Sequence, residues 1–179
     1  MEQQDYALAE PSGLNQEAIA ALANQLADFT SYTVGQELEH VVAAAGGKIQ
    51  YLDLYGAGGS SDSGSIKIEG FRDFTITLAN HTGPLRDRFT VAHELGHYLL
   101  HYLYPKQVLD KPLAKVMAER YGFGLSETEA NVFAACFLMP DKEYRAAYKK
   151  VGGAHTELSD KFGVSTRASK LRAKNLGLE

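Results

Sequence analysis

Two histidines lie four residues apart in the segment 89–101, which reads FTVAHELGHYLLH. Residues at this spacing lie on one face of a helix, so the His93 and His97 imidazoles could bind one zinc ion. Glu94 is rotated by about 100° around the helix axis from His93, so it can reach a water molecule that the metal activates. The pattern therefore predicts metal-assisted hydrolysis, with Glu94 as the general base. The alternative interpretation is a pair of surface histidines on an amphipathic helix.

A catalytic zinc site needs a third protein ligand, with the fourth position left for water. His101 is the nearest candidate in sequence. It lies eight residues beyond His93, about 12 Å along an unbroken helix, which is too far to share the ion. We therefore expect His101 to be a rim or core histidine.

A better third ligand lies in the segment 126–134, which reads SETEANVFA. Glu127 and Asn131 are four residues apart, so a helix places a carboxylate beside an amide that can hydrogen-bond to a zinc-bound histidine. Glu129 points to another side, about 200° from Glu127, and is the less favoured alternative. Ser126 can cap this helix, a structural role that is compatible with Glu127 as a ligand.

The hydrophobic periodicity predicts the elements that position these residues. A helix capped by Ser12 or Asn15 is followed by a helix over 34–45 and a strand over 48–54. Alternating runs at 66–69 and 74–78 predict a β-hairpin. Further helices are predicted at 85–102, 108–121, 126–138, 141–151, 157–162 and 165–176. The glycine- and serine-rich stretch 56–64 is predicted to be a loop connecting strands, or alternatively a flap over a site.

Composition narrows the classes of protein further. The chain has 179 residues, a formal net charge of -4 and one cysteine. The acidic balance argues against a protein that mainly coats nucleic acid, and one cysteine excludes an internal disulfide framework. There is no basic-then-apolar leader and no apolar run long enough to span a membrane. We expect a soluble, cytoplasmic protein.

Three segments together resemble the ImmA/IrrE family of metallo-endopeptidases. They are RFTVAHELGHYLLH at 88–101, ETEANVFAACFLMP at 127–140 and FGVSTRASKLRAKNLGL at 162–178. The resemblance implies one zinc ion per chain, with His93, His97 and Glu127 as ligands, Glu94 as general base and Asn131 behind the ligands. It also implies a protein substrate, typically a helix-turn-helix repressor encoded nearby, whose cleavage switches on gene expression.

The implied fold is α+β, with a small zincin-like core. A three-stranded, largely antiparallel sheet would pack on helices that include the zinc helix. We expect this core and its N-terminal helices to occupy residues 1–156, and a helical tail with a helix-turn-helix rhythm to occupy 157–179. In such an architecture the strand 74–78 would lie at the sheet edge above the metal and hold an extended peptide.

The tail carries five basic residues with no acidic residue between them: Lys161, Arg167, Lys170, Arg172 and Lys174. We expect it to dock a folded substrate, since the acidic net charge makes DNA binding the less favoured role. Two further functions stay open: a non-proteolytic regulator that uses zinc only for structure, and a SprT-like protease acting on DNA-bound proteins. The group that stabilises the oxyanion is also open, among Tyr98, Tyr121, Tyr144 and Arg172.

Overall fold

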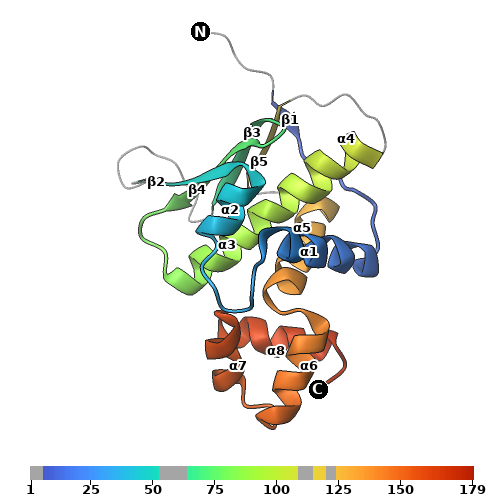
Figure 1. The fold of residues 1–179 in the computed structure, drawn as a ribbon, viewed down its shortest axis with the longest axis vertical. Coiled ribbons are helices and arrows are strands. Elements are labelled where there is room, and N and C mark those ends of the chain that lie inside the picture. The colour runs from blue at the N-terminus through green and yellow to red at the C-terminus, as the bar shows by residue number, and fades with distance from the viewer. Residues whose placement is uncertain (1–5, 53–63, 109–114, 120–123) are drawn as a thin grey trace.

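The computed structural model describes residues 6–52, 64–108, 115–119 and 124–179. Two helices, α1 (Gln16–Thr30) and α2 (Glu39–Ala45), precede the main strands, and a short strand β1 (Ala7–Leu8) precedes both. The strands β2 (Gly47–Leu52), β3 (Ser65–Gly70) and β4 (Asp73–Ala79) lead into the long helix α3 (Pro84–Gly96) (Figure 1). The remaining elements are η2 (His97–Leu103), α4 (Tyr104–Val108), β5 (Val116–Glu119), α5 (Leu125–Leu138), α6 (Asp141–Lys150), α7 (His155–Phe162) and α8 (Thr166–Asn175).

The α+β class is confirmed. Among the residues that the structure describes, the sheet has five strands, in the order β1-β5-β3-β4-β2, where three were expected. Strand β3 runs antiparallel to both β4 and β5, whereas the outer pairs β2–β4 and β1–β5 are parallel. Strand β5 falls within the segment 108–121 that periodicity had assigned to a helix. A strand this short has no readable period, and its hydrogen bonds go to β3, which is distant in sequence.

The prediction that the strand 74–78 forms the sheet edge was wrong. Strand β4 lies between β3 and β2, and β2 pairs with it in parallel from Gly47 to Leu52. Its side chains Phe74, Ile76 and Leu78 are buried. A strand was predicted over 48–54, close to the observed β2, but alternation within one strand does not reveal which strands become its neighbours. The loop predicted at 56–64 lies almost wholly outside the described residues.

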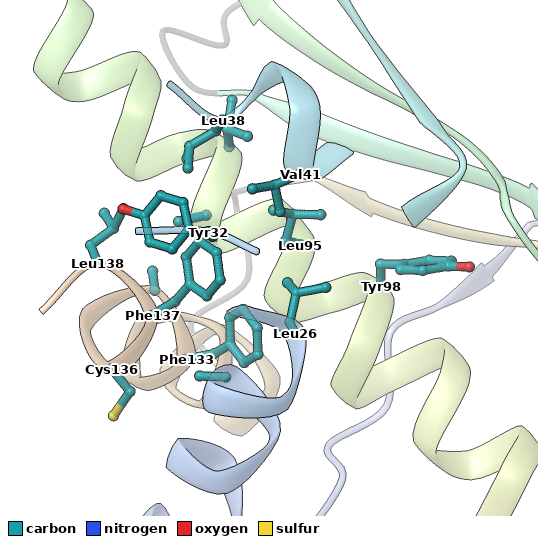
Figure 2. Close-up of a cluster of buried hydrophobic side chains, with 14 of the residues drawn as sticks. Leu26, Tyr32, Leu38, Val41, Leu95, Tyr98, Phe133, Cys136, Phe137 and Leu138 are labelled. Carbon is teal, nitrogen blue, oxygen red and sulfur yellow. The ribbon is translucent and has the colours of Figure 1, made fainter. Parts of the chain in front are cut away.

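Helix α3 packs against α5, and α5 also packs against α1, so three segments distant in sequence share one core. Figure 2 shows Leu26 of α1, Leu95 of α3, and Phe133 and Phe137 of α5 converging in this core. Asn15, one of the two predicted caps, fixes the start of α1, because its side chain accepts a hydrogen bond from the Ala18 N–H. None of the helices in the described part of the chain is long and apolar enough to cross a lipid bilayer.

The helix that carries His93 and His97 changes its geometry at the second of these histidines. The regular α-helix ends at Gly96, and residues 97–103 continue as a π-helical segment, η2. Segments of this kind are rare and are enriched at functional sites. On the sheet side, the Tyr98 ring stacks on Phe74 of β4, with ring centroids 4.2 Å apart, and the Tyr98 hydroxyl accepts the Arg72 N–H. The segment is therefore fixed to the sheet.

Helices α6, α7 and α8 gather at the end of the molecule opposite the sheet (Figure 1). Helix α7 ends at Gly163 in the left-handed conformation, and Ser165 then caps α8 by accepting the Ala168 N–H. Arg172 of α8 is buried, and its Nε donates to the Met139 carbonyl oxygen at 2.9 Å. Arg172 is therefore an internal anchor between α8 and the end of α5, which corrects its expected place on a docking surface.

Candidate metal centre

Three side chains converge on one point: His93 of α3, His97 at the start of η2 and Glu127 of α5. The His93 and His97 Nε2 atoms lie 3.1 Å apart. The Glu127 carboxylate lies across from both, with Oε2 3.2 Å from His93 Nε2 and Oε1 3.1 Å from His97 Nε2. Both imidazoles are buried, and the carboxylate is partly exposed. The structure therefore brings together the three residues that the sequence analysis selected as ligands.

The close approach of α3 and α5 is what makes this convergence possible. A Cβ at Gly96 would lie 3.2 Å from the Ala130 Cα and 3.2 Å from the Phe133 Cβ. Only a hydrogen fits comfortably at that position, because these contacts are tighter than normal packing allows. Gly96 lies between His93 and His97, directly before the π-helical segment, and Ala130 is about one turn from Glu127. The glycine thus sets the distance between the histidines and the carboxylate.

Each imidazole is held from behind by a second polar group. Asn131 Oδ1 lies 3.0 Å from His93 Nδ1, so the His93 proton stands on Nδ1 and the Nε2 lone pair faces the centre. His97 Nδ1 lies 2.9 Å from His101 Nδ1, and His101 Nε2 lies 2.9 Å from Glu129 Oε2. Outer partners of this kind orient the histidines of metal sites.

Burial and hydrogen bonding set the ionisation of the acidic residues. Burial alone would raise the pKa of Glu127, but the His93 and His97 imidazoles beside the carboxylate outweigh burial and lower that pKa to about 2. The pKa of Glu129 is also lowered, because N–H and O–H donors around the carboxylate outweigh its burial. Burial, together with the neighbouring His97, lowers the pKa of His101 to about 4. Near neutral pH the centre therefore presents a carboxylate, and His101 is a neutral imidazole.

The three donors fit a zinc ion. In a tetrahedral site with bonds of about 2.0–2.1 Å, neighbouring donor atoms stand roughly 3.3 Å apart. The separations of 3.1–3.2 Å among the two Nε2 atoms and the carboxylate oxygens are close to that value. A lone pair on His93 and a carboxylate facing each other also require a positive charge between them. Two histidines and one carboxylate are the donor set of catalytic zinc sites that leave one position open.

The remaining predicted residues lie as follows. Glu94 is buried on α3, one residue beyond His93. Glu129 faces His101 and residues near the N-terminus, outside the group of three donors. Among the oxyanion candidates, Tyr144 hydrogen-bonds to the Ser169 carbonyl oxygen, and Tyr98 and Arg172 are engaged as described above. Tyr121 lies outside the described residues.

Sequence reasoning missed the contact chain from His97 through His101 to Glu129. His101 was set aside because it cannot reach the ion, although its spacing of four from His97 repeats the spacing between His93 and His97. That repeated spacing, together with a second glutamate close to Glu127, was the signal available. Its meaning depended on the packing of α5 against η2, which the sequence alone does not reveal.

Comparison with known proteins adds three findings. The family model described as the IrrE N-terminal-like domain, Peptidase_M78, matches residues 42–174. The solved structure of a Mycobacterium tuberculosis transcriptional regulator superposes with a TM-score of 0.60 at 16% sequence identity, over 86% of this chain and 45% of that chain. This chain therefore spans less than half of that regulator, and the likeness concerns the fold. No sequence among curated proteins matches significantly.

Proposed function

The chain belongs to the family of the IrrE N-terminal-like domain, Peptidase_M78, and on that premise we propose that it is a zinc-dependent endopeptidase. The observation that carries the proposal is the convergence of His93, His97 and Glu127, with donor atoms all within 4.8 Å of one another. Family membership supports a metallopeptidase, and the donor set supports zinc as its metal. His93, His97 and Glu127 would hold the ion, and Asn131 would orient His93.

Zinc, when bound, supplies Lewis acidity for a water molecule and for the scissile carbonyl group. The residues of the chain supply the proton transfers. Glu94 accepts the proton of the attacking water and returns it to the amine of the leaving peptide. Glu94 is buried on α3, so its carboxylate is shielded from bulk solvent. A site that used zinc only for structure would have no need of this carboxylate.

We further propose a protein substrate, with a helix-turn-helix transcriptional repressor as the first candidate. The sequence motifs that resemble the ImmA/IrrE family support this substrate class, and one solved structure with a similar fold is that of a transcriptional regulator. Docking would use the exposed basic residues of the tail, such as Arg167, Lys170 and Lys174. Cleavage of the repressor would relieve repression of its target genes.

The test is cleavage of a purified candidate repressor, beginning with one encoded beside this protein, in the presence of zinc. The wild type and Glu94→Gln are compared, with zinc content measured for both. We expect the variant to retain the metal and lose cleavage, because only the proton acceptor has changed. Equal cleavage by both proteins would exclude Glu94 as the base. Zinc binding and repressor binding without any cleavage by the wild type would favour the non-proteolytic regulator.

A further inference from the structure

A continuous line of polar contacts leads from His97 to the segment before α1. His97 Nδ1 contacts His101 Nδ1, and His101 Nε2 contacts Glu129 Oε2, each at 2.9 Å. The Glu129 carboxylate then accepts the Ser12 N–H at 2.8 Å, the Ser12 hydroxyl at 3.0 Å and the Gly13 N–H at 2.9 Å. Residues 12 and 13 are thus linked to a donor of the candidate metal centre through two side chains.

The proton positions along this line follow from the chemistry of the groups. Glu129 Oε2 is an acceptor, so the ring proton of His101 stands on Nε2 and is donated to that oxygen. His101 Nδ1 is then a lone pair, and the proton between the two Nδ1 atoms must belong to His97. The His97 Nε2 atom is left as a lone pair that faces Glu127 and His93. If each proton stood on the other ring nitrogen, His101 Nε2 and Glu129 Oε2 would be two acceptors facing each other at 2.9 Å.

We propose that His101 and Glu129 are positioning residues of the metal centre, and that they make the docking of the Ser12–Gly13 loop part of its construction. His101 fixes the tautomer and the ring orientation of His97, and Glu129 fixes those of His101. The loop, in turn, satisfies the Glu129 carboxylate, which would otherwise be a partly buried charge with fewer donors. The inference rests on the proposed metal site.

The first experiment compares His101→Leu with His101→Gln by zinc affinity, measured by competition with a chromophoric chelator. A glutamine can accept from His97 through its oxygen and donate to Glu129 through its amide, whereas leucine can do neither. Losing an outer partner of a ligating histidine typically weakens metal binding by about 10–100-fold, so this loss is expected for leucine. Glutamine should stay within about threefold of the wild type. Thermal unfolding of the metal-free proteins shows that each variant is folded.

The second experiment tests the Ser12–Gly13 loop in the 179-residue chain through a matched pair at Gly13. Gly13 has φ +72, and a Cβ there would meet no atom within 4 Å. Asparagine tolerates this left-handed conformation, whereas proline requires a negative φ and lacks the N–H that Glu129 accepts. Gly13→Pro should therefore weaken zinc binding by about tenfold, and Gly13→Asn should leave it unchanged. Glu157→Gln, at an exposed position of α7, serves as the remote control.

The third experiment reads the tautomers of His97 and His101 directly in the zinc-loaded protein, by long-range ¹H–¹⁵N correlation of labelled histidines. We expect the proton of His97 on Nδ1 in the wild type and in His101→Gln. A His97 proton on Nε2 in the wild type would overturn the inference, as would equal zinc affinities for His101→Leu and the wild type. Equal zinc affinities for Gly13→Pro and Gly13→Asn would show that the Ser12–Gly13 loop does not contribute to the metal centre. A wild type that bound no zinc would count against the proposed metal site itself, so the two failures are distinguishable.

Discussion

Replacement of Gly96 by alanine tests whether the spacing of α3 and α5 holds the metal centre together. The new Cβ would lie 3.2 Å from each of three atoms: the Ala130 Cα and the Phe133 Cβ and Cδ1. The first two belong to or adjoin the α5 backbone and cannot rotate away, so α5 must retreat by a few tenths of an ångström. Glu127 lies on the same helix and must move with it.

Two opposing energies decide the stability of Gly96→Ala. Alanine gains about 0.8–1.0 kcal/mol over glycine in a helix interior. Overpacking a tight core contact costs about 1–3 kcal/mol. Because all three contacts are short and two involve the main-chain region, we place the cost at the upper end and expect a net loss of about 1–2 kcal/mol. Valine adds two carbons to the same contact, so Gly96→Val should lose about 3 kcal/mol or more.

Urea unfolding of the metal-free protein measures this stability, and chelator competition measures zinc affinity. Metal–donor distances tolerate shifts of only about 0.2 Å, so Gly96→Ala should also weaken zinc binding by about tenfold. Gly70→Ala is the control, because a Cβ at that glycine meets no atom within 4 Å. If Gly96→Ala were as stable as the wild type and bound zinc equally well, the proposed role of this helix contact would be refuted.

Two other predictions concern the partners of buried polar groups. Asn131→Ala should weaken zinc binding by about 10–100-fold without loss of fold, because His93 Nδ1 loses its acceptor; unchanged affinity in the chelator assay would contradict this. Arg172→Ala should lower the free energy of unfolding by about 2–4 kcal/mol, since the Met139 carbonyl loses a charged donor and the buried stem is removed. The exposed neighbour Lys170→Ala should change it by less than about 0.5 kcal/mol, and similar values for both variants would argue against the anchoring role.

The sequence was most informative where local spacing determines geometry. The interval of four residues placed His93 and His97 on one helix face, and the same interval placed Glu127 and Asn131 together on another helix. The alternating runs correctly predicted the hairpin of β3 and β4. In each case the deciding interactions lie within one element or between adjacent elements, where periodicity is a reliable guide.

The structure differs from the sequence-based predictions where contacts between distant parts of the chain determine the fold. Strand β5 exists because β3 offers it hydrogen bonds, and β4 lies inside the sheet because β2 covers its other edge. Arg172 carries a charge that periodicity assigns to a surface, yet the Met139 carbonyl makes its burial possible. The role of His101 is visible only in the structure, where α5 brings Glu129 beside it. None of these partners is close to its counterpart in sequence, so no local pattern could reveal them.

The metal centre itself is tested most directly by a crystal structure of the zinc-loaded wild type, with anomalous data collected on both sides of the zinc absorption edge. We predict one anomalous peak per chain, about 2.0–2.2 Å from His93 Nε2, from His97 Nε2 and from a Glu127 oxygen, with Glu94 close by but not bonded to the ion. A peak that is bonded to His101 or Glu129, or the absence of any peak between His93, His97 and Glu127, would contradict the assignment of this site.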